Sequence, residues 1–235
     1  MVHDVFYEHG FTEPAGNFQQ NNFNKGGIGG DLIIINIQKS DKENTASFHT
    51  PPDGQYGVLN LHIFTNTKPN RDSALDNTIL THELTHGLSS RLTGGALEIM
   101  CMSETEPLGL SEGYSDMMAL IFTAKPEDTR NTEKVISEYV KGNSRGMRMY
   151  TYTTDMKVNP LNIKTLLERS TDTAWKQGNI MFLQLFVGTL MLQPCNPTFY
   201  SAYDAMLAAD YAYYGGIHEH LIIKGFTKRG LGSIL

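Results

Sequence analysis

The chain has 235 residues, of which 40% are hydrophobic and 19% are charged, and its formal net charge is −6 at pH 7. This length is enough for one large domain, or for one domain with two lobes, and the composition excludes an intrinsically disordered protein. The acidic balance, without any basic run interleaved with aromatic residues, argues against nucleic acid or an anionic membrane as a partner.

Neither a membrane span nor a secretion signal is expected in the chain as written. Residues 180–192 (IMFLQLFVGTLML) are the most apolar stretch, but they are too few to cross a bilayer, and we expect a buried core helix there. The N-terminal MVHDVFYEHGF carries charges where a signal peptide has its apolar stretch. The two cysteines, Cys101 and Cys195, are too few for a disulfide framework, and they are either bonded to each other or both free.

Strands are predicted within the first seventy residues. Residues 29–38 (GGDLIIINIQ) form a β-branched run introduced by glycines, and residues 56–66 (YGVLNLHIFTN) alternate as a strand does. Between them, residues 50–55 (TPPDGQ) have the proline and Asp-Gly chemistry of a turn.

Helices are predicted from residue 73 onward. Ser73 is suited to cap a helix that runs through His86, and further helices are predicted at residues 111–124, 132–141, 161–169, 180–192 and 197–210. The sequence therefore predicts an α+β fold, with a β-rich part at residues 1–72, a helix within residues 73–92 and a helical part at residues 93–235.

The motif HELTH places His82 and His86 four residues apart, with Glu83 beside the first histidine. Residues four apart share one face of a helix, so both imidazoles can bind one zinc ion, and Glu83 can take a proton from the water that such an ion binds. Leucines on another face, at positions 80, 84 and 88, are expected to pack into the core. The alternative is a surface helix that contains this pattern by chance.

A catalytic zinc ion needs a third protein ligand. The later stretch GLSEGYSDMMAL offers Glu112 as that ligand, and Asp116, one turn further on, can accept the other ring N–H of a liganding histidine. The alternative is that two acidic residues in the first turns of a helix complement the helix dipole.

Together, THELTHGLSSRLTGG and GLSEGYSDMMA resemble the fungalysin family, extracellular zinc metallopeptidases of fungi with a thermolysin-like fold. Four further stretches follow that family's order, so the likeness covers nearly the whole chain: YEHGFTEPAGNFQQNNFNKGGIGGD, FHTPPDGQYG, LQPCNPTFYSAYDAMLAAD and GFTKRGLG. The resemblance implies a thermolysin-like zincin with the HExxH helix between its two lobes.

The same resemblance implies a set of roles and partners. His82, His86 and Glu112 would be the zinc ligands, and Glu83 would be the general base and acid. The substrates would be proteins or peptides, and the location would be secreted and extracellular. Members of this family are made as zymogens with a propeptide, and this chain starts inside the catalytic domain, so we expect a partial catalytic domain over residues 1–235.

An internal segment is also expected to be missing. Family members carry a Val-His-x-x-Gly segment, whose histidine resembles a hydrogen-bond donor to the tetrahedral oxyanion, but this chain has no histidine between His86 and His218. His218 and His220 are expected to be exposed loop residues without a catalytic role.

A tyrosine serves as a second oxyanion donor in thermolysin-type sites, and the candidates in this sequence are Tyr114, Tyr150 and Tyr152.

The strand GGDLIIIN resembles the family's edge strand, which would hold an extended substrate backbone; the alternative is an ordinary core strand.

The sequence leaves three functions open. The first is a zinc-dependent metalloendopeptidase, in which Glu83 passes the proton it has taken to the leaving amine. The second is a catalytically impaired, metal-binding homologue that no longer cleaves peptides. The third is an unrelated helical binding module with an accidental HExxH motif.

Overall fold

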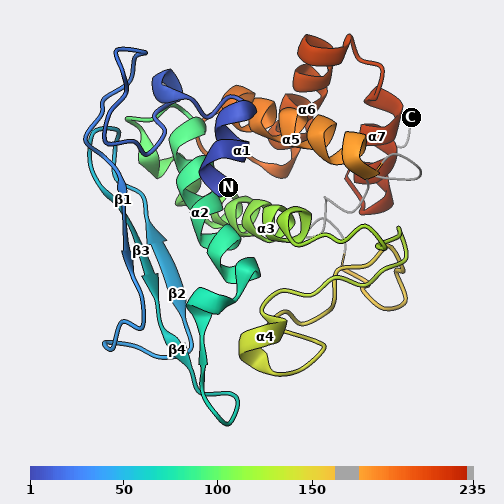
Figure 1. Cartoon of the computed structure of the whole chain (residues 1–235). Helices are drawn as coiled ribbons and strands as arrows, with labels where there is room; N and C mark the ends of the chain where they lie inside the picture. Colours follow the sequence, from blue (N-terminus) through green and yellow to red (C-terminus); the bar gives the residue numbers. More distant parts are fainter. Residues whose placement is uncertain (162–174, 232–235) are drawn as a thin grey trace.

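The computed structural model describes residues 1–161 and 175–231 (Figure 1). The strands of the described residues form a three-stranded sheet in the order β1-β3-β2 and a smaller sheet of β4 and β5. Their bounds are β1 Ile33–Asn36, β2 Ala46–His49, β3 Gly57–Leu61, β4 Ile63–Phe64 and β5 Arg71–Asp72. Strand β3 pairs in parallel with β1 and antiparallel with β2, so β1 and β2 form the two edges of the sheet.

The helices account for most of the chain after residue 76. They are α1 (Val2–Glu8), α2 (Asn77–Leu92), α3 (Thr105–Phe122), α4 (Glu138–Lys141), α5 (Trp175–Leu192), α6 (Phe199–Tyr214) and α7 (Glu219–Lys228), with short 3-10 turns η1 (Glu13–Ala15), η2 (Ser73–Leu75) and η3 (Ile99–Met102). Helix α2 packs against β2 on one side and α3 on the other, and α5 and α6 lie beyond α3 (Figure 1). The α+β class predicted from the sequence is confirmed.

Two predicted strands are shorter than expected. Only Ile33–Asn36 of residues 29–38 is a strand, and residues 56–66 divide into β3 and β4 at His62. The buried His62 ring lies 3.0 Å from the Thr45 carbonyl and 3.0 Å from an Asp41 carboxylate oxygen. Its own carbonyl accepts hydrogen bonds from the Ser73 backbone and hydroxyl, so its backbone leaves the ladder.

The helix predicted at residues 132–141 is mostly wrong. Only Glu138–Lys141 is helical, because the backbone of Lys134 pairs with Tyr152 in an isolated β-bridge and Ser137 has a left-handed φ of 64°. The predicted helix at residues 161–169 falls almost entirely outside the described residues. Helices α1 and α7 were not predicted.

Two helix starts also differ from the prediction. Helix α2 begins after Asp76, whose side chain accepts the Thr78 N–H at 3.1 Å, whereas Ser73 belongs to η2. Helix α3 begins at Thr105, six residues before the predicted start at 111.

The apolar side of α2 joins two parts of the core, as predicted for its three leucines. Leu88 is fully buried with Met118 of α3 and Phe186 of α5, while Leu80 and Leu84 pack against a second cluster beneath the sheet. The approach of α2 to the sheet is close, because a Cβ atom added at Gly87 would lie 2.8 Å from Phe18 and 2.9 Å from Phe48.

Arg91, in the last turn of α2, is fully buried and ties the helix to the N-terminal loops. Its Nη1 atom lies 3.0 Å from Asp31 and 3.2 Å from Asp53, and its guanidinium stacks 4.2 Å from the centre of the Phe18 ring. Its other hydrogen bonds reach the backbone carbonyls of Gly16, Pro51, Pro52 and Gln55. This network fixes the end of α2 relative to the turn at residues 50–55.

Cys101 and Cys195 form a disulfide, which settles the alternative left open by the sequence. It joins η3 to the segment that follows α5.

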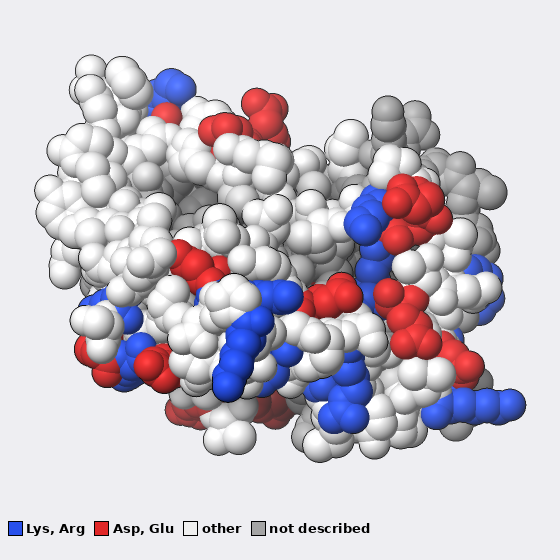
Figure 2. All heavy atoms as spheres, turned by 60° about the horizontal axis from the view of Figure 1, so that its bottom comes forward, with Lys and Arg blue, Asp and Glu red and all other residues white. Residues whose placement is uncertain are grey.

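None of the helices in the described part of the chain is long and apolar enough to cross a membrane. On the face drawn in Figure 2, basic and acidic side chains are interspersed, and the described residues there form no broad basic patch.

We expect Arg91→Met to lower the free energy of unfolding by about 3–5 kcal/mol, because it leaves the Asp31 and Asp53 carboxylates buried without their cation. Urea unfolding followed by circular dichroism would measure the change. Arg145→Met, at an exposed arginine, is the matched control and should change stability by less than about 0.5 kcal/mol. Equal effects of the two substitutions would contradict the anchoring role of Arg91.

Candidate active site

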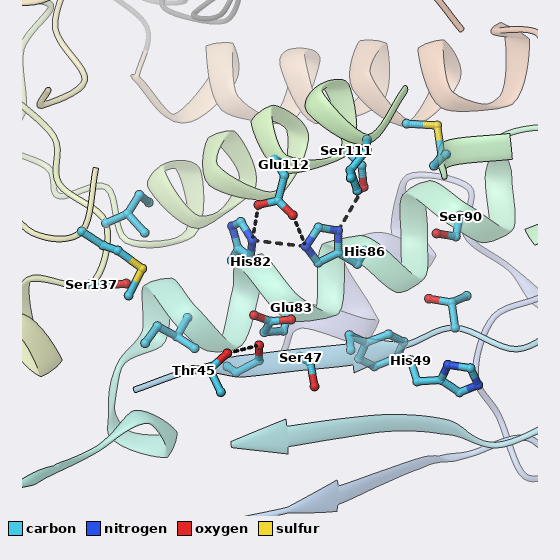
Figure 3. A pocket seen from close by; sticks show the side chains of 18 of the residues that line it. Thr45, Ser47, His49, His82, Glu83, His86, Ser90, Ser111, Glu112 and Ser137 are labelled. Carbon is cyan, nitrogen blue, oxygen red and sulfur yellow. Dashed lines mark hydrogen bonds and ion pairs between the residues drawn. The ribbon is translucent and has the colours of Figure 1, made fainter. Parts of the chain in front are cut away.

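A cleft of about 640 Å³ lies between α2, β2 and α3. Helix α2 runs along it with Ile79, His82, Glu83, His86 and Ser90 among the lining residues. Figure 3 shows Thr45 and Ser137 at one end, His49 and Ser90 at the other, and the two histidines with Glu112 between them. Glu83 and the three predicted ligands are thus brought together at the middle of one cleft.

His82, His86 and Glu112 form a group that can hold a metal ion, with one possible ligand atom from each residue within 4.8 Å of the others. The two Nε2 atoms are 3.2 Å apart, and Glu112 oxygens lie 3.3 Å from His82 Nε2 and 3.5 Å from His86 Nε2. A tetrahedral zinc ion with bonds of about 2.0–2.1 Å separates its ligand atoms by about 3.3–3.4 Å. These two imidazoles and one carboxylate therefore fit zinc in both chemistry and spacing.

The other ring nitrogens of the two histidines have different partners. His82 Nδ1 lies 2.7 Å from an Asp116 carboxylate oxygen, which can only accept, so this ring carries its proton on Nδ1 and turns Nε2 toward Glu112. His86 Nδ1 instead lies 3.0 Å from the Ser111 hydroxyl and 3.3 Å from the Ser115 hydroxyl. The site therefore orients one histidine with a carboxylate and the other with neutral hydroxyls.

The helix-dipole alternative for Glu112 and Asp116 does not hold. Helix α3 begins at Thr105, so Glu112 lies about two turns inside the helix and Asp116 about three. The favourable effect of the dipole on an acidic side chain is confined to the first turn.

Arg148 and Tyr152 complete the surroundings of Asp116, and sequence reasoning did not single out Arg148. Arg148 donates Nε to Asp116 Oδ2 and Nη2 to Asp116 Oδ1, both at 2.5 Å, and the Tyr152 hydroxyl donates to Oδ2 at 2.5 Å. Burial alone would raise the pKa of Asp116, but the hydrogen bonds from His82 and Arg148 lower it to about 2. The carboxylate is therefore a permanent anion at neutral pH.

Burial shifts the other titratable groups of the cleft in opposite directions. It raises the pKa of Glu83 to about 7, with His82 opposing the shift. It lowers the pKa of His86 to about 4, assisted by the positive charge on His82. For His82, burial would lower the pKa, but the hydrogen bonds to Asp116 and Glu112 raise it to about 9.

Strand β2, not β1, borders this cleft, which corrects the interpretation of GGDLIIIN as the edge strand beside the site. Residues 44–50, which include all of β2, line the cleft, whereas no residue of β1 does. Both strands are sheet edges, but β1 lies on the far side of β3 from α2 (Figure 1).

The tyrosine candidates lie outside the cleft lining. Tyr114 is buried, and its hydroxyl donates to Gln193 at 3.0 Å; Tyr152 donates to Asp116; and Tyr150 is half-buried. The described residues therefore place no tyrosine on the cleft wall.

The two late histidines also lie outside the cleft lining. His218 is not an exposed loop residue, because it precedes α7 with its ring half-buried and its Nδ1 atom 2.7 Å from the buried Asp210. His220 is exposed as expected, although it lies within α7.

An α+β fold in which an HExxH helix and a glutamate from the next long helix form one group that can hold a metal ion is compatible with the class of zincin-like peptidases. A sequence model of the fungalysin metallopeptidase family (M36) matches residues 1–175 and 167–234. The chain belongs to this family.

Relatives from three fungi are similar over almost the whole chain. "Extracellular metalloproteinase MEP" of Pyricularia oryzae is 39% identical over 99% of this chain, and "Extracellular metalloproteinase 1" of Arthroderma gypseum is 38% identical over 99%. "Extracellular metalloproteinase MEP" of Leptosphaeria maculans is 39% identical over 98%. The chain spans 42% of the length of each of these relatives.

The comparisons also locate missing positions inside the chain. The alignment with the Pyricularia relative is 268 positions long, whereas this chain has 235 residues, so at least 33 positions of that relative have no counterpart here. The family match consists of two segments that meet and overlap at residues 167–175. This pattern agrees with the loss of an internal segment that the sequence analysis expects between His86 and His218.

Asp116→Asn is expected to weaken zinc binding by about 10–100-fold, because an amide orients the His82 ring less firmly than a carboxylate does. Competition with a chromophoric chelator would measure the affinity. Asp210→Asn is the matched control, since Asp210 is also buried and also lies 2.7 Å from a histidine, but away from the cleft. An equal loss of zinc affinity in both variants would contradict the orienting role of Asp116.

Zinc affinity is also expected to rise with pH between about 7 and 9, by up to about tenfold per unit. The pKa of His82 in the free protein is raised to about 9, so at pH 7 this ring holds a proton that zinc must displace, and raising the pH removes the competing proton. The same competition at several pH values, corrected for protonation of the chelator, would test this. An affinity independent of pH over this window would refute it.

Proposed function

We propose that this chain is a zinc-dependent metalloendopeptidase with a thermolysin-like, two-lobed architecture and is secreted to the extracellular space. The proposal treats residues 1–235 as a partial catalytic domain, with a β-rich part (1–72), an active-site helix (73–92) and a helical lobe (93–235). One observation carries it: His82, His86 and Glu112 present three zinc-type ligand atoms 3.2–3.5 Å apart, beside the buried Glu83. The relatives' printed names support both the activity and the secretion.

In this proposal His82, His86 and Glu112 hold the metal, and Asp116 orients the His82 ring. Zinc bound there would supply a Lewis acid that polarises a peptide carbonyl and acidifies a water molecule. Arg148 and Tyr152 hold the Asp116 carboxylate in place, so the His82 ring keeps its direction when substrate enters.

Glu83 acts as the general base and then as the general acid. Its side chain is buried on the cleft side of α2, between the ligand group and β2 (Figure 3). Burial raises the pKa of Glu83 to about 7 in the free protein, which supports proton uptake by this carboxylate near neutral pH. It can therefore receive the proton of the attacking water and deliver it to the leaving amine.

The substrate backbone lies along β2 in an extended conformation. Among the described strands, β2 pairs with β3 only, and its residues line the cleft, so the other edge of β2 borders the cleft. Such an edge binds an extended peptide by adding it as a further strand. The substrates are accordingly unfolded segments of proteins or peptides.

A second candidate is a metal-binding homologue that no longer cleaves peptides efficiently. The specific observation for it is the absence of at least 33 aligned positions together with the lack of any histidine between His86 and His218. Loss of one oxyanion donor typically lowers the rate by about 10²–10³. The two candidates share the metal site and differ in turnover.

Glu83→Gln is expected to lower peptide cleavage by at least about 10²-fold while the protein still binds one zinc ion, because the amide cannot accept the proton. Zinc per protein by elemental analysis and cleavage of a quenched fluorescent peptide library would be measured together. Glu127→Gln, at an exposed glutamate, is the matched control.

The outcomes separate the candidates. Zinc with Glu83-dependent cleavage supports the peptidase, and zinc without cleavage by the unsubstituted protein supports the impaired homologue. Absence of zinc binding contradicts both.

A further inference from the structure

One buried histidine outside the metal group contacts the strand that borders the cleft. His62 lies between β3 and β4, is 2% exposed and does not itself line the cleft. Its ring lies beside the backbone of Thr45, the residue before β2, and Thr45 does line the cleft. Figure 3 shows Thr45 at the end of the cleft opposite His49 and Ser90. Neither metal binding nor proton transfer uses His62.

The two nitrogens of the His62 ring both face oxygens that accept hydrogen bonds. Nδ1 lies 3.0 Å from the Thr45 carbonyl, and Nε2 lies 3.0 Å from Asp41 Oδ1. Lys39 Nζ lies 2.9 Å from the other Asp41 oxygen, and this hydrogen bond lowers the pKa of Asp41, so the carboxylate is ionised at neutral pH and can only accept. A neutral imidazole has one N–H group and can donate to one of the two oxygens, whereas an imidazolium can donate to both. The geometry therefore matches the protonated ring.

Asp41 is the charged group that pairs with this ring. The charged side chains on the segments around His62 are Lys39, Asp41, Lys42 and Glu43 before β2, Arg71 and Asp72 in β5, and Asp76 before α2. Asp72 and Asp76 each cap the helical turn that follows, and Arg71 donates to a backbone carbonyl in α4. Within the described residues, the ion pair of His62 is with Asp41 alone.

Asn44 holds the same segment to the same place by bonds that carry no charge. Its N–H donates to the Ile63 carbonyl at 3.0 Å, and its side chain accepts the Thr65 N–H at 2.8 Å and donates to the Thr65 hydroxyl at 3.0 Å. Asn44 also lines the cleft. The two cleft residues that precede β2 are thus both fixed by the junction of β3 and β4, and only the contact through His62 depends on a titratable group.

We infer that His62 is a positioning residue for the peptide: its imidazolium form holds residues 41–45, and with them the start of β2, in the place where β2 receives an extended substrate. The inference rests on the proposed peptidase function and on peptide binding along β2. The ring acts through the Thr45 carbonyl and does not touch the peptide.

The direction of the pH dependence follows from the two donations. The donating form of the ring is the protonated one, so both contacts are present at low pH, and one is lost as the pH rises through the range in which histidines titrate, about pH 5 to 8. One ring nitrogen then faces an oxygen with no hydrogen between them, and residues 41–45 are held less firmly. The bonds of Asn44 keep the segment attached, because they do not change over this range. Peptide affinity therefore falls as the pH rises.

The protonation state is tested on the unsubstituted, zinc-loaded chain by nitrogen-15 NMR of its histidine rings. We expect the His62 signal to show two protonated nitrogens at about pH 5. Asp41→Asn assigns the signal, because it changes the partner of Nε2. A His62 ring with a single proton at this pH would overturn the inference, and the readout depends neither on cleavage nor on the folding of a His62 variant.

Peptide binding is measured in the Glu83→Gln background, which removes both cleavage and the titration of Glu83, with excess zinc and a fluorescently labelled library peptide. We expect the affinity to fall by about fivefold from about pH 5 to 8, the effect of one hydrogen bond. Asp41→Asn should remove this fall, because an amide can donate to the neutral ring at Nε2. His220→Gln, at an exposed histidine outside the cleft lining, is the matched control and should keep it.

The outcomes separate this inference from the proposed activity. In cleavage assays the same difference between the unsubstituted chain and Asp41→Asn should appear in KM and not in kcat, because His62 does not contact the reacting atoms. Glu83-dependent cleavage with the same pH dependence of KM in both would overturn the positioning role and leave the peptidase. A pH-dependent peptide affinity that Asp41→Asn removes would support the role even in a chain that does not cleave, and neither cleavage nor peptide binding would overturn both.

Discussion

The contact between His82 and Asp116 is the interaction on which the arrangement of the cleft depends. It joins α2 to α3 through a hydrogen bond of 2.7 Å in a buried setting, and Arg148 and Tyr152 bring a third segment to the same carboxylate. A buried anion with three donors is stable only while all of them are present, because each unpaired group would carry a large desolvation cost. The network therefore aligns the metal ligands and one wall of the cleft at the same time.

Arg91 anchors the C-terminal end of α2, where a second buried ion-pair network holds the helix against the N-terminal loops. Its guanidinium is surrounded by two carboxylates and four backbone carbonyls, so the loops at residues 16 and 50–55 cannot move independently of the helix. Since β2 ends just before the second of these loops, the position of the cleft edge follows from Arg91. The Cys101–Cys195 disulfide adds a third fixed point, at η3. The cleft is thus held at three points, by the ion-pair networks of Asp116 and Arg91 and by one disulfide.

The sequence predicted those features that depend on local spacing. His82 and His86 share a face because helical geometry places residues four apart together, and the donor chemistry of Glu112 and Asp116 completed the site. Features set by the tertiary path of the chain were missed. Arg148 reaches Asp116 only because an irregular loop returns to α3, and the burial of Arg91 depends on carbonyls from distant loops. Likewise β2 (ASFH) lacks the apolar run that predicted β1 (IIIN), and only the pairing order decides which of these two edge strands faces the cleft.

The two candidate functions differ less in structure than in rate, and the location of the missing positions explains why. Among the residues that the structure describes, all those that line the cleft lie between positions 44 and 148, within the first segment matched by the family model, whereas the two matched segments meet at residues 167–175. The metal group, its orienting carboxylate, Glu83 and the edge of β2 are therefore all built by chain that precedes the gap. An oxyanion donor contributes mainly to the transition state, so its loss lowers turnover without removing the metal or the bound peptide. The residues proposed to bind the metal and the peptide thus belong to one part of the chain, whereas the segment expected to be missing would affect the rate of the chemical step.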